Sequence, residues 1–581
     1  MTITTRGAAA ATSAGADTKG LDVEALEAAV EKVTAQAERW AATGPAERAL
    51  LLDQILADTL AAAPAWLDAA CAAKGLDPAS IDGGEELFSG MGTFLRMTRT
   101  LRDSMQDILR TGRPQFPGPV REAPDGRLVV QVFPSSTFDK LLFAKTTGEV
   151  WIEPGITRAE LEAQQAPAYR DPAAHAGVSL VLGAGNVASL GPRDVLSKLF
   201  VEGKVVVLKA NPVNDYLVPH WSRAMRSLID AGFLAIVEGG AEAGKHLTAH
   251  ASIDEIHVTG SDKTHDAIVF GVGEEGAKRK AANEPLVTKP VSCELGNVSP
   301  VIIVPGEWSA KDIAYQAEHV ATMLVNNAGF NCLTPRVLIT WAGWPQRAQF
   351  LSALTDVLRS VPTRRAYYPG AAERRQAFLD VHPDALELGA TAEGDLPWTL
   401  IPGVDSSDHG DICFNVEAFC SLMAETQLAA DSPADFVDAA VDFANDVVWG
   451  TLSATVLAHP SSLSDPSVGP RIEAGIAALR YGGIGLNLWH GLVFALGTTT
   501  WGAYPGHLIT DIQSGSGVVG NAYMLEGTQK SVVTGPFRSS PKPPWFATAK
   551  NGRATMDKLL GFEAAPSWAK LPALMLAALR N

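Results

Sequence analysis

The sequence predicts an α/β protein with two open parallel α/β domains, one of them Rossmann-like, and a small β element beside them. Short apolar runs alternate with helix-like segments at 178–182, 205–209, 234–237 and 256–259. This alternation builds a parallel sheet that helices cover on both faces. A second series of the same kind follows, with strand-like runs at 301–304 and 337–340. At 581 residues the chain is also too long for a single core.

The N-terminal region is expected to be helical after a short leader. Residues 1–20 are rich in alanine, threonine and glycine, which is too weakly apolar for a signal-peptide core, so we expect a disordered leader. The helical pattern from 46 to 73 should be interrupted at Pro64, because proline lacks a backbone N–H. Strand-like patterns follow at 127–133 and 149–152, and they predict a strand pair.

Composition argues against several classes of protein. A net charge of -17 disfavours nucleic acid as a partner, because phosphate binding needs a basic surface. No apolar run reaches the length of a bilayer span, so we expect no transmembrane segment. The five cysteines are odd in number and widely spaced, without a Cys-x-x-Cys pair. They indicate a reducing compartment, hence a cytoplasmic protein, and we expect no metal site.

Cys332 is the first candidate for chemistry. It lies on a polar, glycine-containing turn between a helix-like run at 313–325 and the strand-like run at 337–340. A thiolate on such a turn can act as a nucleophile, and backbone N–H groups aimed at the sulfur lower its pKa. The alternative is a small core residue, since free cysteine is among the most buried residue types. Partners elsewhere in the sequence must decide between the two interpretations.

Glu294 is the second candidate. It lies in the segment Cys293–Asn297 among apolar neighbours. In a dry pocket its pKa would rise toward the range of a general base. The alternative is a buried structural carboxylate with a partner.

Three further segments suit a nucleotide. Gly183–Ala188 follows a strand and precedes a helix, but ends in alanine where a dinucleotide fingerprint has glycine more often. Gly239–His246 resembles a phosphate-binding loop but lacks the Ser or Thr that would hold magnesium, so it does not predict nucleotide hydrolysis; its backbone could still face a cofactor phosphate. Lys209 ends a strand, where an open α/β sheet binds its ligand.

In order and spacing these segments resemble the aldehyde dehydrogenase superfamily over roughly residues 22 to 535. Asn186 and Lys209 stand 23 apart, as the oxyanion asparagine and the cofactor-ribose lysine of that family do. The other matching segments are Gly239–Gly244, Ile256–Ser261, Cys293–Pro300, Gly329–Cys332 and Glu417–Phe419.

The resemblance implies definite roles. Cys332 would be the nucleophile, Asn186 a donor to the oxyanion and Glu294 the general base. The residues implied to bind a nicotinamide cofactor are Lys209, Gly240, Gly244, Thr259, Gly260, Ser261, Leu295, Glu417 and Phe419. The substrate would be a small-molecule aldehyde, oxidised to a carboxylate.

The sequence also departs from the family pattern. Gly185 replaces the usual tryptophan before Asn186, and Asn297 replaces a glycine. Pro212 stands where the family has an acid that binds a ribose 2'-hydroxyl and repels a 2'-phosphate, which leaves both NAD and NADP open. There are two alternatives. One is an enzyme in which coenzyme A replaces water as the acyl acceptor, or an acyl-CoA reductase that runs in the reverse direction. The other is a non-catalytic scaffold of the same fold.

The resemblance also divides the chain. The expected units are a disordered leader at 1–20, a dinucleotide-binding domain at 21–125 and 155–298, a catalytic domain at 299–505, an oligomerisation element at 126–154 and 506–536, and a C-terminal tail at 537–581. The oligomerisation element implies a homodimer or homotetramer. The tail is apolar enough for a membrane surface, but an apolar helical stripe more often faces its own core.

Overall fold

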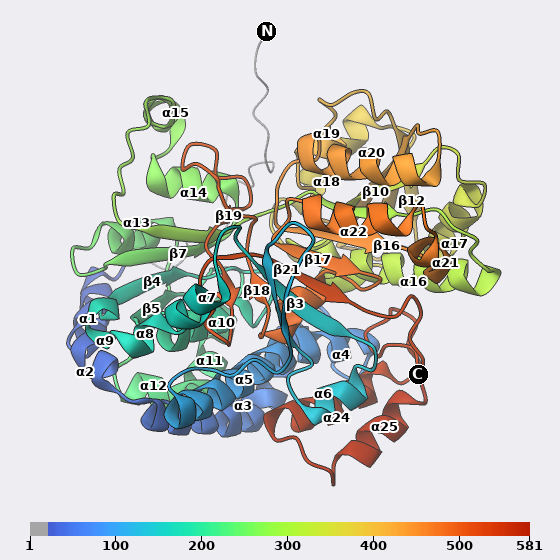
Figure 1. The fold of residues 1–581 in the computed structure, drawn as a ribbon. Coiled ribbons are helices and arrows are strands. Elements are labelled where there is room, and N and C mark those ends of the chain that lie inside the picture. Colours follow the sequence, from blue (N-terminus) through green and yellow to red (C-terminus); the bar gives the residue numbers. More distant parts are fainter. Residues whose placement is uncertain (1–20) are drawn as a thin grey trace.

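A computed structural model describes residues 21–581, and the predicted leader at 1–20 lies outside the described residues. The predicted α/β class is confirmed: two parallel-rich sheets, one of six strands and one of eleven, form the centre (Figure 1). Helices lie against both. In Figure 1 the smaller sheet is on the left in green, and the helices of the larger one are on the right in yellow and orange.

The six-stranded sheet contains the predicted Rossmann-like series. Its order is β19-β8-β7-β4-β5-β6, and all neighbours pair in parallel except β19 with β8. The strands are β4 (Val178–Leu182), β5 (Val205–Lys209), β6 (Leu234–Val237), β7 (Glu255–Thr259), β8 (Val291–Glu294) and β19 (Gly515–Ser516). Its helices include α10 (Leu190–Leu196), α11 (Val218–Ala224), α12 (Arg226–Asp230), α13 (Ala241–Ala249), α14 (Asp262–Val269) and α15 (Gly273–Ala282).

The eleven-stranded sheet joins distant parts of the chain. Its strands, in spatial order, are β1 (Val120–Glu122), β2 (Leu128–Phe133), β3 (Thr147–Ile152), β21 (Thr528–Thr534), β17 (Gly483–Leu486), β16 (Ser453–Leu457), β9 (Ser299–Ile303), β10 (Pro335–Trp341), β15 (Leu422–Leu428), β14 (Trp398–Val404) and β12 (Leu386–Leu388). The segments expected to form an oligomerisation element thus supply β2, β3 and β21, which extend the catalytic sheet. Its helices include α16 (Ala310–Val325), α17 (Arg347–Ser360), α18 (Ala371–Val381), α20 (Pro433–Asp446) and α22 (Gly469–Ala478).

The N-terminal helices lie along the left side and the lower end of the molecule as drawn in Figure 1. They include α1 (Val23–Thr34), α2 (Ala37–Ala42), α3 (Pro45–Lys74), α4 (Ile81–Leu87) and α5 (Thr93–Thr111). The predicted break at Pro64 is wrong, since α3 runs through it. Pro64 is exposed and so is Leu60, four residues earlier, so the carbonyl that loses its hydrogen bond faces water.

By length and composition alone, α3 could cross a bilayer, which the sequence did not lead us to expect. Half of its most apolar window is buried in the protein, where α3 lies along α5 and inserts Leu52 and Trp66 into the core. The core helix of a soluble fold passes the same test, so the finding is weak evidence for a span.

The C-terminal tail docks on the protein, as predicted. Its helices, α24 (Gly552–Ala564) and α25 (Leu571–Ala578), lie beside the blue N-terminal helices in Figure 1. Glu563 accepts hydrogen bonds from Arg96 at 2.6 Å and Arg99 at 2.7 Å, and all three side chains are buried. The tail is therefore held by buried ion pairs as well as apolar packing.

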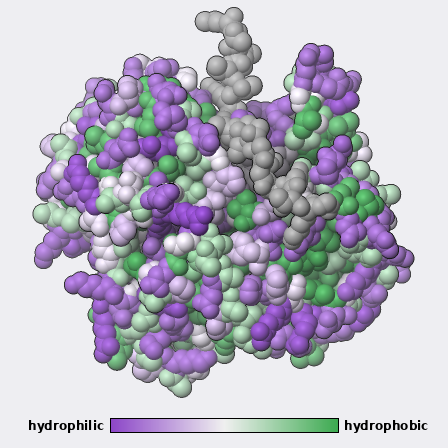
Figure 2. Space-filling view, turned by 180° about the vertical axis from the view of Figure 1, so that it is seen from behind, coloured by the Kyte–Doolittle hydropathy of each residue, from purple (hydrophilic) through white to green (hydrophobic). Residues whose placement is uncertain are grey.

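Most of the large apolar side chains lie in the interior. The buried core draws on nearly every helix and strand of the two sheets. On the face opposite to Figure 1, hydrophilic residues cover much of the visible surface and apolar residues form scattered groups (Figure 2).

Candidate active site

Cys332 lies just after a strained turn at the end of α16. A capping box of Ser309 and Asp312 starts this helix. After it, Asn327 (φ 50°) and Ala328 (φ 55°) adopt the left-handed conformation that non-glycine residues rarely use. Gly329 follows with φ 78°, and a Cβ there would lie 2.3 Å from the Cys420 carbonyl oxygen. Only glycine fits, so close packing against the neighbouring segment fixes the path of the turn.

The structure brings Cys332 and Glu294 together. The thiol donates to Glu294 Oε1 with Sγ and oxygen 3.3 Å apart. Glu294 ends β8 and is 2% exposed, and its Oε2 has no hydrogen-bond partner among residues 21–581. The pair therefore connects the end of β8, in the six-stranded sheet, to the turn that precedes β10.

Burial controls the protonation of this pair. Burial raises the pKa of Cys332 well above its usual value, and the charges of Glu294 and Glu417 raise it further. Burial also raises the pKa of Glu294, although Trp501, Cys332 and Arg193 partly offset the effect. Both shifts favour the protonated forms, and the thiol lies within hydrogen-bond reach of the carboxylate.

Asn186 contacts the turn through its side-chain amide and through its backbone carbonyl. Its Nδ2 donates to the Phe330 carbonyl oxygen at 2.9 Å. The backbone carbonyl oxygen of Asn186 accepts from Asn327 Nδ2 at 3.0 Å and from the Tyr367 hydroxyl at 2.8 Å. The predicted oxyanion donor is thus adjacent to the Cys332 turn, with its amide engaged by the backbone.

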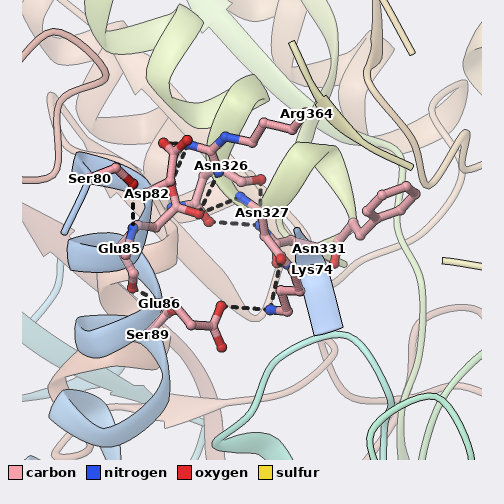
Figure 3. A network of polar contacts seen from close by, with 12 residues as sticks. Lys74, Ser80, Asp82, Glu85, Glu86, Ser89, Asn326, Asn327, Asn331 and Arg364 are labelled. Atoms are coloured by element: carbon pink, nitrogen blue, oxygen red, sulfur yellow. Dashed lines mark hydrogen bonds and ion pairs between the residues drawn. The ribbon is translucent and has the colours of Figure 1, made fainter. Parts of the chain in front are cut away.

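A buried ion pair, missed in the sequence, supports this arrangement (Figure 3). Lys74, the C-terminal residue of α3, pairs with Glu86 Oε2 at 2.7 Å. It also donates to Asn327 Oδ1 at 3.0 Å and to the Asn186 carbonyl oxygen at 3.3 Å. Asn327 in turn donates to the Phe330 carbonyl oxygen and to Asn331 Oδ1, each at 3.1 Å. One buried ammonium group therefore holds both the turn and Asn186.

A second ion pair holds the start of the turn. Glu85 Oε1 accepts from the Asn327 backbone N–H at 2.7 Å and from Arg364 at 2.8 Å, and Arg364 also contacts Asp82 (Figure 3). Glu85 and Asp82 lie on α4, more than 200 residues before the turn. No local pattern in the sequence could have linked them to Cys332.

The residues expected to bind the cofactor gather at one edge of the six-stranded sheet. Lys209 is the last residue of β5, in register with Leu182 of β4 and Val237 of β6. Thr259 ends β7, and the Gly260 N–H donates to the Glu294 carbonyl oxygen at 3.0 Å. These are carboxyl ends of parallel strands, where such sheets bind ligands.

Two helices begin at this edge of the sheet, one without a side-chain cap and one with a serine cap. Gly240 is the N-cap of α13 and Gly244 lies in that helix, while Ser261 caps α14 by accepting from Thr264 N. Gly239, before α13, has φ 139° and leaves no room for a Cβ beside Ala243. A nine-residue helix behind a tight glycine turn suits a cofactor phosphate.

The other three predicted cofactor residues are mostly enclosed. Leu295 is fully buried in the core, and its N–H donates to the Ser514 carbonyl oxygen. Burial raises the pKa of Glu417 to about 7, and its buried Oε1 has no partner among the described residues. Phe419, at φ 41°, packs near Phe330. Glu417 Oε1, which has no partner among the described residues, could accept a hydrogen bond from a ribose hydroxyl of a nicotinamide cofactor.

A group of potential metal ligands lies elsewhere. Ligand atoms of His382, Asp411 and Cys413 lie within 4.8 Å of one another. Asp411 already accepts from the Cys413 backbone N–H at 2.7 Å and pairs with His382 at 3.0 Å. The carboxylate thus serves as a helix cap and an ion-pair partner, which accounts for the group without a metal.

Comparison with known proteins agrees with this geometry. Residues 160–371 match the model of the aldehyde dehydrogenase family. N-succinylglutamate 5-semialdehyde dehydrogenase from Novosphingobium aromaticivorans is 29% identical over 167 residues. The match spans 28% of this chain and about a third (32%) of that relative's length.

Solved structures share the fold at low identity. Aldehyde dehydrogenase from Mycobacterium tuberculosis, complexed with NAD+, gives a TM-score of 0.58 at 20% identity, covering 87% of this chain and 89% of that one. A mutant of aldehyde dehydrogenase C from Pseudomonas syringae, with NAD+ and octanal, gives 0.57 at 16%, covering 89% and 90%. Glyceraldehyde-3-phosphate dehydrogenase from Methanocaldococcus jannaschii, with NADP, gives 0.57 at 13%, covering 89% and 95%.

Proposed function

We propose that this chain is a member of the aldehyde dehydrogenase superfamily and that it oxidises an aldehyde to a carboxylate with NAD or NADP. The observation that carries the proposal is the 3.3 Å contact between Cys332 Sγ and Glu294 Oε1. A nucleophile and a base within hydrogen-bond reach are the minimum for covalent catalysis.

The mechanism begins with a proton transfer. Glu294 takes the proton of Cys332, and the sulfur attacks the aldehyde carbon to give a thiohemiacetal. The Cys332 backbone N–H and Asn186 Nδ2 would stabilise the oxyanion. Because that amide donates to Phe330 in the described arrangement, oxyanion binding requires the Asn186 side chain to rotate.

A bound nicotinamide would accept the hydride that converts the thiohemiacetal to a thioester. Lys209 and Glu417 would bind the ribose hydroxyls of the cofactor, and the start of α13 would bind one of its phosphates. In the second half, Glu294 first passes the proton it took from Cys332 to solvent and then deprotonates a water molecule that attacks the thioester carbon. The C–S bond breaks, so Cys332 is regenerated and the carboxylate product is released. Cofactor choice is open because Pro212 removes the acid that would select NAD.

The decisive experiment varies cofactor and acyl acceptor together. Purified protein is assayed with an aldehyde panel, with NAD or NADP, and with or without coenzyme A. We expect wild type to reduce the cofactor in the absence of coenzyme A, and we expect Cys332→Ala to lose this activity. A strict requirement for coenzyme A would instead assign an acylating dehydrogenase. If wild type and Cys332→Ala show the same trace activity, the protein is a non-catalytic scaffold of the same fold.

Assembly and location belong to the same proposal. A homodimer or homotetramer is expected, formed through the segments that contain β2, β3 and β21, and a monomer by light scattering would contradict it. Cytoplasmic function is supported by five cysteines that form no disulfide.

A further inference from the structure

We propose that Trp545, from the segment after β21, forms part of the wall that binds the substrate's chain, and that the preferred aldehydes are uncharged and apolar. The inference rests on the proposed function. The segment concerned, residues 537–549, is called the strap below. It lies outside residues 160–371, which match the family model.

The nucleophile belongs to an apolar cluster. Cys332 is half-buried and packs against a core that includes Leu190, Leu492, Phe494 and Trp501. The members of this cluster that keep exposed surface, apart from Cys332, are Phe88, Phe143, Val187, Leu333 and Trp545. They come from distant parts of the chain and share this cluster with Cys332, so they are its apolar side chains that keep surface for a ligand.

The strap is fixed to the helix that leads to the nucleophile. Lys542 pairs with Glu318 of α16 at 2.8 Å. The Ala547 N–H donates to Thr322 Oγ1 at 2.9 Å, and the Phe546 ring stacks on His319 with centroids 5.4 Å apart. Since α16 ends at the Cys332 turn, the strap has a fixed position relative to the thiol.

Trp545 reaches across to the N-terminal helices. Its ring stacks on that of Phe88, with centroids 6.4 Å apart and planes 14° apart. Phe88 follows α4, the helix whose Glu85 and Glu86 support the Cys332 turn. The stacked pair therefore closes one side of the cluster with two aromatic faces, which suit an aliphatic or aromatic chain.

Charge near the thiol argues against an acidic substrate. Two carboxylates, Glu294 and Glu417, act on Cys332. The nearby cations are Arg193 and Arg336, which are 1% and 3% exposed. Arg193 lies beneath the Phe494 ring at 3.6 Å, and Arg336 donates to backbone carbonyl oxygens, so both are shielded from a ligand. A substrate carboxylate would be repelled, while an uncharged chain would gain apolar contact.

The test compares chain lengths. Values of kcat and KM are measured for propanal, hexanal, octanal and succinic semialdehyde, with wild type, Trp545→Ala and Trp545→Phe. Trp568→Ala is the matched control, because Trp568 is also on the tail but packs on Phe138 and is 64% exposed. Thermal unfolding of each variant separates a folding defect from a binding defect.

We expect wild type to favour octanal over succinic semialdehyde. Trp545→Ala should raise KM for hexanal and octanal about tenfold and leave propanal within about twofold, because only longer chains reach the indole. Trp545→Phe should restore most of the loss, and Trp568→Ala should match wild type. An equal loss on every aldehyde, an unchanged chain-length profile or a preference for the semialdehyde would overturn the inference while leaving aldehyde oxidation intact. Absence of turnover on all four would overturn the proposed function itself.

Discussion

At the scale of single residues, Cys332 and Glu294 each depend on the charge of the other. Burial raises the pKa of the thiol, and the Glu294 charge raises it further. Removing that charge in Glu294→Gln should lower the thiol pKa. At a fixed pH below that pKa, more thiolate is then present and alkylation is faster, by about tenfold for each pKa unit.

The measurement is the pH dependence of iodoacetamide alkylation at Cys332, followed by mass spectrometry. Glu294→Gln should shift the midpoint to lower pH, yet reduce turnover by about a hundredfold or more because the base is lost. A midpoint that stays in place or moves upward would show that the carboxylate does not act on the sulfur.

Lys74 gives a second prediction at this scale. Lys74→Met leaves Glu86 buried without its partner, which should cost about 3–5 kcal/mol of unfolding free energy. The double variant Lys74→Met with Glu86→Leu removes both charges and should recover much of that stability. Its kcat should stay low, because Asn327 Oδ1 and the Asn186 backbone carbonyl oxygen each still lack one of their donors.

Urea unfolding and steady-state kinetics on the same preparations check this prediction. If the double variant regains wild-type kcat along with its stability, the ion pair serves folding alone. If KM rises while kcat is kept, Lys74 acts on substrate binding rather than on the turn.

At the scale of elements, the connection from α16 to β10 depends on Gly329. Gly329→Ala would place a Cβ 2.3 Å from the Cys420 carbonyl oxygen, which is backbone and cannot move aside cheaply. We expect a loss of kcat of about a hundredfold or more, because a displacement of about 1 Å at the nucleophile is enough for that. The proposed cofactor contacts on the six-stranded sheet should be kept, whereas Glu417 and Phe419, which directly precede Cys420, should shift with it.

The matched control is Gly126→Ala. Gly126 has φ 82°, close to the 78° of Gly329, but no atom lies within 4 Å of its added Cβ. It isolates the cost of the left-handed conformation, about 1–2 kcal/mol. Equal effects of the two substitutions on kcat would refute the role of close packing at Gly329.

The elements differ in how far the sequence could predict them. The strands at 178–182, 205–209 and 234–237 match the predicted runs, because a buried parallel strand is continuously apolar. The break at Pro64 was wrong, since exposure of the freed carbonyl was not visible in the sequence. The supporting ion pair of Lys74 and Glu86 could not be predicted, because its residues lie on helices of ordinary pattern.

At the scale of the whole molecule, the buried Glu563 ties α24 to α5. Glu563→Gln leaves Arg96 and Arg99 short of a negative charge, although Arg96 keeps Asp139 at 2.7 Å. We expect about 3–5 kcal/mol lower stability and earlier proteolysis within the tail. Asp557→Asn, which removes an exposed ion pair with Arg553 on the same helix, should cost less than about 1 kcal/mol.

Urea unfolding with limited proteolysis checks both variants. Equal stability losses in the two would show that tail docking depends on surface charge. Loss of activity in Glu563→Gln at temperatures where it stays folded would show that the docked tail also sets the position of the strap.

The ion pair between Arg96 and Glu563 also bears on synthesis, because its members are 467 positions apart. A ribosome makes Arg96 and Cys332 long before Glu563 or Trp545 exists. Until then the two arginines remain hydrated, and Phe88 lacks the ring that later covers it. The surroundings of Cys332 are therefore complete only after the strap has been synthesised, and a chain interrupted before the strap would hold the thiol in an unfinished pocket.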